Sequence, residues 1–253
     1  MKKKDRIIAK VASRSKKRSH QYGIEVPRNV RHALELDKQN GNTLWSEAIH
    51  REMSEVRVAF DIKEKDSKVE PGREYLECFM IFDVKMDFTR KARFVANGAK
   101  TVYTSNTYAG VVSKETVRIA LTYAALNNLD LFAADIKNAY LQAPITEKYY
   151  SRCGPEFGAE LHGNVAYIVR ALYGTKCAGR DFRNHLRECM DMLRYISFTA
   201  DPDLWMRKAT KDEKGNLRPH YKVLCPRGVS HVNGSQDVRY NYRYNLAMKG
   251  MVN

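Results

Sequence analysis

The chain has 253 residues, of which 43% are hydrophobic and 29% charged, which is enough apolar material for a sizeable core in one or two domains. No apolar run reaches the length of a membrane span, and the Met1-Lys2-Lys3-Lys4 start lacks the hydrophobic stretch of a signal peptide, so we expect an intracellular protein, nuclear or cytoplasmic, without membrane contact. Five cysteines with no C-x-x-C pair are expected to be reduced thiols.

The net charge of +15 is concentrated at the two ends. Residues 1–22 hold nine Lys and Arg against Asp5, a net charge of +8, and residues 225–253 carry +3. Basic ends of this kind bind phosphate polyanions without sequence preference and in a salt-sensitive way. The same composition is also typical of a solvated disordered arm. We expect residues 1–22 to be disordered and leave open whether they bind nucleic acid or direct nuclear import.

The first periodic segment after this arm predicts a helix over about Thr43 to Val56. Its apolar residues Trp45, Ile49, Met53 and Val56 fall on one face and predict core packing. A polar linker ending at Pro71-Gly72 follows.

Two strands are then expected, near Glu77–Val84 and Thr89–Ala96, joined as a hairpin through Lys85-Met86-Asp87. The next helix is predicted from an N-cap at Ser113, with one face made of Val117, Ala120, Leu121 and Ala124. A buried strand near Leu129–Ala134 and another near Val165–Leu172 follow. A last helix carries Phe182, Leu186, Cys189, Leu193 and Ile196 on its inner face. This order, without internal repeats, predicts an α+β fold.

Two sets of residues are candidates for chemistry. Asp135 ends an apolar strand, which suits a ligand of a divalent metal, but spacing alone favours a carboxylate that terminates a core strand or caps the next turn. Lys91 and Arg93 are two residues apart on a strand and so share one face, where they could bind a triphosphate. An ordinary solvated basic face has the same pattern.

Several blocks in a fixed order resemble the reverse transcriptases of copia-type LTR retrotransposons, over about residues 22–224. They include a basic hairpin at 88–98, the Tyr108–Ser113 segment with its following helix, the first catalytic motif around Asp135, and the Arg170–Lys176 stretch. Gly154–Gly158 lies between the last two of these blocks, and Asp201–Trp205 follows at the distance expected for the family. The resemblance implies fingers and part of a palm over residues 23–224, between the basic arm and an irregular tail at 225–253.

The family's activity implies roles for individual residues. It is an RNA-directed DNA polymerase that uses two divalent ions, Mg²⁺ or Mn²⁺, with an RNA or DNA template-primer and dNTPs as partners. Asp135 would be the catalytic residue and metal ligand. Nucleotide binding would fall to Lys91, Arg93, Tyr140, Tyr173, Gly174 and Lys176, with the Tyr140 ring against the incoming sugar.

The chain departs from the family pattern in four places. Thr175, Gly179 and Phe182 replace the usual Leu, Pro and Trp, while Asp201 and Asp203 match a segment expected to be a structural turn without metal. After Leu224 the Tyr-Val-Asp-Asp hairpin, which supplies two further metal ligands, is replaced by Cys225-Pro226-Arg227. Asp237 is the only acid beyond Glu213.

We therefore expect a degenerate and inactive polymerase fragment, since one carboxylate cannot hold two metal ions. A strand lost with the hairpin would leave the 129–134 strand with an unpaired edge, apolar residues around Ile136, Ala139 and Val169 uncovered, and the chain poorly soluble. One alternative is a domesticated, non-catalytic nucleic-acid-binding protein whose tail tyrosines, Tyr240, Tyr242 and Tyr244, stack on bases. Another is a polymerase whose missing acids come from a partner chain.

Overall fold

The computed structural model describes residues 20–102, 106–126, 129–134, 136–207, 210–211, 217–218, 222–226 and 245–250. The chain forms two compact units: the described residues of the first lie within Met1–Thr101 and Lys148–Ile168, and those of the second within Val102–Glu147, Val169–His231 and Val238–Asn253. Helices and strands mix in both, which confirms the expected α+β class. Among the helices of the described segments, none is both long and apolar enough to cross a bilayer.

The first unit begins with the short hairpin of β1 (His20–Gln21) and β2 (Ile24–Glu25), followed by two helices, α2 (Val30–Asn40) and α3 (Leu44–Val56). The periodicity did not predict α2. Asn29 caps it by accepting the His32 N–H at 2.9 Å, and Gly41 ends it at φ 63°. The helix expected from Thr43 is confirmed as α3, and all four stripe residues are buried.

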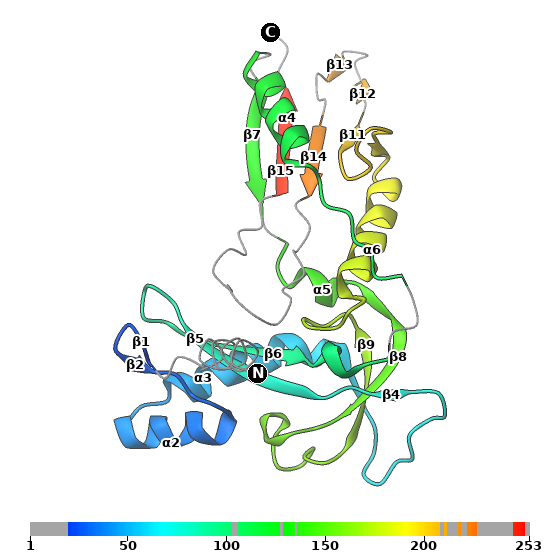
Figure 1. Ribbon diagram of the computed structural model, residues 1–253. Coiled ribbons are helices and arrows are strands. Elements are labelled where there is room, and N and C mark those ends of the chain that lie inside the picture. The colour runs from blue at the N-terminus through cyan, green and yellow to red at the C-terminus, as the bar shows by residue number, and fades with distance from the viewer. Residues whose placement is uncertain are drawn as a thin grey trace, which may run out of the picture. The chain divides into compact units, whose positions relative to one another are not determined.

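The predicted hairpin is also confirmed, as β5 (Cys78–Val84) paired with β6 (Arg90–Ala96). Met80, Val84, Ala92, Phe94 and Ala96 are the buried residues of the hairpin. Helix α3 packs against β6 (Figure 1). The Phe94 N–H, on the edge of β6 away from β5, donates to Glu52 Oε1 of α3 at 2.9 Å, so a side chain satisfies an edge group that lacks a strand partner.

A second sheet of the first unit has the order β3-β9-β8-β4. Its strands are β3 (Phe60–Ile62), β4 (Glu74–Tyr75), β8 (Pro144–Arg152) and β9 (Val165–Arg170). The rings of Phe60, Phe94 and Phe157 lie edge to face, with centroids 5.3 to 5.7 Å apart. They join this sheet, the hairpin and the turn η3 (Pro155–Phe157) in one aromatic core.

The second unit is built on a five-stranded sheet of order β10-β11-β14-β15-β7. Its strands are β10 (Ile196–Ser197), β11 (Trp205–Arg207), β14 (Lys222–Pro226), β15 (Asn245–Gly250) and β7 (Leu129–Ala134). Strand β15 pairs with β7 along its whole length, from Asn245↔Ala134 to Gly250↔Leu129. The expected unpaired edge on this side of β7 is therefore wrong, and so is an irregular tail at 245–250. The short pair β12 (Thr210–Lys211) and β13 (Leu217–Arg218) lies apart from this sheet.

Helix α4 (Lys114–Leu126) lies against β7 (Figure 1). Ser113 caps it as predicted, because its Oγ accepts the Thr116 N–H at 2.9 Å. Ala120 and Ala124 are buried with Val112, and Val117, Leu204 and Met206 pack against them. Leu121, expected on the same face, is instead 37% exposed.

Two further helices complete this unit: the short α5 (Ala139–Gln142) and the longer α6 (Ala178–Met192). Ala139 is 2% exposed, so the expectation that it lacks covering neighbours is wrong, whereas Val169 is 40% exposed. Helix α6 ends before Leu193 and Ile196, which are 51% and 56% exposed and do not belong to its inner face. The backbone turns away at Arg194, whose φ is 60°.

Candidate functional site

The basic face of β6 in the first unit carries two of the candidate residues. Ala92, Phe94 and Ala96 are buried, while the alternate residues Lys91 and Arg93 are half-buried. The prediction that Lys91 and Arg93 share one face is confirmed. Across the hairpin Lys91 is opposite Asp83, and Arg93 is opposite Ile81.

Burial shapes the electrostatics of this face. It is the main cause that lowers the pKa of Lys91, and the neighbouring charges of Arg93 and Lys85 lower it further, against Glu52 and Asp83. Burial also raises the pKa of Glu52, which its hydrogen bond from Phe94 and the charge of Arg93 partly offset. An anion placed on this face would relieve the repulsion between the two cations.

The second unit brings together two of the remaining candidates, Tyr140 and Tyr173. Their ring centroids are 4.9 Å apart, and the Phe182 ring meets Tyr140 edge to face at 6.1 Å. Tyr140 is 6% exposed and belongs to a buried cluster with Ala139, Ala143, Ala171, Ala178 and Phe182, against which Tyr173 packs. Phe182, an expected departure from the family pattern, thus fills an aromatic position.

Gly174 and Lys176 lie in the loop between β9 and α6. Gly174 is exposed and has φ 93°, a conformation that favours glycine. Thr175 between them is 2% exposed, and its hydroxyl donates to the Leu172 carbonyl at 2.9 Å, so the Thr in place of Leu leaves no unsatisfied polar group. A Cβ at Gly179 would lie 3.1 Å from the Ala109 Cβ, which makes this position tight for a larger residue.

Sequence reasoning missed a buried carboxylate beside these residues, Asp181. Its side chain is fully buried and accepts the Thr146 N–H at 3.1 Å and the Thr146 hydroxyl at 3.0 Å. Arg180 donates to it through Nε at 3.0 Å and to the Asn106 carbonyl at 2.8 Å. This clamp joins the first turn of α6 to the start of β8. The sequence offered one indication of this role: Asp181 lies in the first turn of a helix, where the helix dipole favours an acid.

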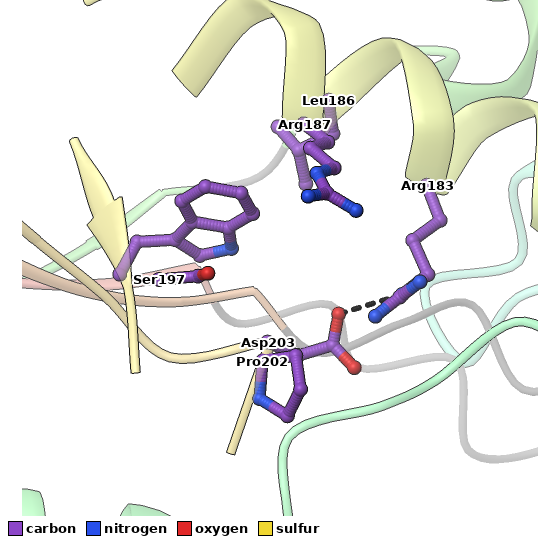
Figure 2. Close-up of a pocket in the computed structure, with 7 residues that line it drawn as sticks. Arg183, Leu186, Arg187, Ser197, Pro202 and Asp203 are labelled. Atoms are coloured by element: carbon purple, nitrogen blue, oxygen red, sulfur yellow. Dashed lines mark hydrogen bonds and ion pairs between the residues drawn. The ribbon is translucent and has the colours of Figure 1, made fainter. Parts of the chain in front are cut away.

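Asp201 and Asp203 have structural roles, as predicted. Asp201 accepts the N–H groups of Ser113 at 3.0 Å and Asp203 at 3.1 Å. Asp203 pairs with Arg183 Nε of α6 at 2.7 Å (Figure 2). Burial would raise the pKa of Asp201, but the Thr116 hydroxyl and the two N–H groups outweigh it and lower the pKa.

The expected two-metal site falls mostly outside the described residues. Asp135 lies outside the described residues, and no group of three or more His, Cys, Asp or Glu that could hold a metal occurs in the segments that the structure describes. The sequence after Leu224 contains one acid, Asp237. Lys91 and Arg93 belong to the first unit, whereas Tyr140, Tyr173, Gly174 and Lys176 belong to the second.

Comparison with known proteins agrees with the order of the sequence blocks. Residues 77–215 match the profile of the family described as reverse transcriptase (RNA-dependent DNA polymerase). The chain is 30% identical over 163 residues to the Transposon Ty1-NL2 Gag-Pol polyprotein of Saccharomyces cerevisiae, and 31% identical over 144 residues to the Ty1-DR4 Gag-Pol polyprotein of the same yeast. These matches cover 58% and 54% of this chain but 9% of each polyprotein.

Proposed function

Because the chain belongs to the copia-type retrotransposon reverse transcriptases, we propose that it comprises the fingers and part of the palm of an RNA-directed DNA polymerase and no longer extends primers. The match over residues 77–215 supports the family assignment, and the lack of an Asp-Asp pair after Leu224 supports the loss of primer extension. The first unit, with its β5–β6 hairpin, corresponds to the fingers, and the second, with β7 and α6, to the palm.

Roles in nucleotide recognition are carried over from the family residue by residue, separately within each unit. Lys91 and Arg93 bind the triphosphate of a dNTP, whose charge would offset their mutual repulsion. Tyr140, held between Tyr173 and Phe182, supports the sugar. The exposed backbone at Gly174 allows a base or phosphate to approach closely, and Lys176 adds a cation beside it.

The chemical step is what this chain lacks. Nucleotidyl transfer in the family uses two Mg²⁺ or Mn²⁺ ions bridged by three carboxylates, and only Asp135 of these is present. The template-primer and the dNTP remain binding partners in this proposal, without turnover.

A primer-extension assay tests the proposal. The purified chain is incubated with poly(rA)·oligo(dT), dTTP and Mg²⁺ or Mn²⁺, beside an Asp135→Asn variant. We expect no extended product from either protein. Extension by the unmodified chain that disappears in Asp135→Asn would refute the loss of activity.

The charge of +8 on residues 1–22 supports a second candidate, a non-catalytic nucleic-acid-binding protein. Binding through this arm would be insensitive to sequence and would weaken steeply with salt. Deletion of residues 1–22 should remove most of the affinity for a single-stranded oligonucleotide and flatten its salt dependence. Unchanged affinity and slope would exclude the arm as the binding site.

A further inference from the structure

A small cavity in the second unit lies between α6 and the β10–β11 strands, and none of the residues assigned to nucleotide binding lines it. Its volume is about 60 Å³. Its lining consists of Arg183, Leu186, Arg187, Ser197, Pro202, Asp203 and Trp205. Figure 2 shows the side chains of Arg183 and Arg187 projecting from α6 on the side where Ser197 and Asp203 lie.

The lining carries a net positive charge. Arg183 pairs with Asp203 through Nε at 2.7 Å, so these two charges cancel. Arg187 makes no hydrogen bond or ion pair with any other residue in the described part of the chain. Two arginines four residues apart on a helix repel each other weakly, and Arg187, the one without a carboxylate, is exposed to solvent.

Apart from Asp203, each of the polar side chains of the lining can donate hydrogen bonds, and the Ser197 hydroxyl can also accept them. A guanidinium has five N–H donors and no acceptor, Ser197 offers a hydroxyl, and Trp205 has an indole N–H. Asp203, the single acceptor with a charge, is 8% exposed and held by Arg183. Arg187 is exposed to solvent, so water solvates its charge, and a bound oxyanion would add a charge-assisted contact that water does not offer.

We propose that this cavity binds a phosphate-sized oxyanion, held by Arg187 and the remaining N–H groups of Arg183 with the Ser197 hydroxyl. Arg–phosphate recognition of this kind is bidentate and charge-assisted. The same chemistry is offered by free inorganic phosphate and by a phosphodiester of a nucleic-acid strand. Trp205, 5% exposed, forms an apolar wall that limits the size of the ligand.

The test uses the full chain and two probes, inorganic phosphate and a short oligothymidylate without terminal phosphate. The variant is Arg187→Gln, and the matched control is Arg118→Gln, an exposed arginine of α4 in the same unit with the same change of charge. We expect Arg187→Gln to raise the dissociation constant of at least one probe about tenfold relative to Arg118→Gln. An effect on phosphate alone indicates a site for the free ion, and an effect on the oligonucleotide alone indicates a backbone site.

Nuclear magnetic resonance locates the binding. The chain has two tryptophans; Trp205 lines the cavity and Trp45 lies in the first unit. Phosphate should shift the indole N–H signal of Trp205 and leave that of Trp45 unchanged. Equal affinities in Arg187→Gln and Arg118→Gln for both probes, or binding without a Trp205 shift, would overturn the proposal.

Discussion

The Asp181 clamp should contribute more to the stability of the second unit than any other single polar group identified in it. Replacing Asp181 with Ala removes the acceptor of the Thr146 N–H and hydroxyl, and leaves Arg180, whose side chain is 15% exposed, with the more distant carboxylate of Glu147 at 3.6 Å. Breaking a fully buried ion pair costs about 3–5 kcal/mol. Because Thr146 is exposed, water can replace Asp181 as the hydrogen-bond partner of its N–H and hydroxyl. We therefore expect Asp181→Ala to lower the free energy of unfolding by about 2–3 kcal/mol.

This loss can be measured in one unit at a time. Trp45→Phe leaves Trp205 as the single tryptophan, so fluorescence then reports on the second unit. At roughly 2–4 °C per kcal/mol for a chain of this size, Asp181→Ala should lower the melting temperature seen by Trp205 by roughly 4–12 °C. Asp181→Asn, which keeps one carbonyl acceptor, should have a smaller effect.

Asp191→Ala is the matched control, since Asp191 is an exposed residue of the same helix. Its effect should stay within about 0.5 kcal/mol. If Asp181→Ala shifts the Trp205 melting temperature no more than Asp191→Ala does, the clamp is not a stabilising interaction and the buried geometry has been misinterpreted.

Three further perturbations are predicted. Gly110→Ala would bring a Cβ against Asp203 Oδ2 and within 3.2 Å of Arg183 Nε. We expect it to lower the free energy of unfolding, measured in urea, by about 1–3 kcal/mol. Gly163→Ala, with no atom within 4 Å of its Cβ, is the comparison that tests only the cost of a positive φ. The pKa of Asp201 is lowered, so its stabilising contribution is present above the ordinary pKa of 3.8 and is lost as the pH falls through the lower folded-state pKa. The difference in stability between the wild type and Asp201→Asn should therefore be larger at pH 7 than at pH 3. A difference that does not change with pH would contradict this. Removing residues 225–253 deletes β15 and exposes the edge of β7, so light scattering should detect aggregation that removal of residues 1–22 does not cause.

Local sequence patterns were sufficient to predict several elements of the fold. The stripe from Trp45 to Val56 predicted α3, alternation predicted the β5–β6 hairpin, and Ser113 was identified as the cap of α4. Each depends on residues a few positions apart, so the relevant interactions are visible in one stretch of chain. The shared face of Lys91 and Arg93 followed from the same argument.

Features that depend on distant partners could not be predicted in this way. The apolar period of α6 continues to Leu193 and Ile196, but the helix ends where the chain returns toward β11 through the left-handed Arg194. Asp181 gains its importance from Thr146, 35 residues earlier in the chain. The pairing of β15 with β7 joins segments more than a hundred residues apart, and nothing in the composition of the tail indicated it.

Strand β15 shows that the segment after Leu224 can support the sheet even where it offers no ligands for a metal. A neighbouring strand satisfies the edge of β7 through backbone N–H and C=O groups, which any sequence other than proline provides. Binding a divalent metal instead requires carboxylate side chains at fixed positions, and the Asn245–Gly250 segment contains none. The strand at residues 245–250 can therefore complete the sheet without supplying any carboxylate ligand. For this reason a soluble, cooperatively melting chain would be compatible with the absence of primer extension, and only the extension assay bears on the proposed loss of catalysis.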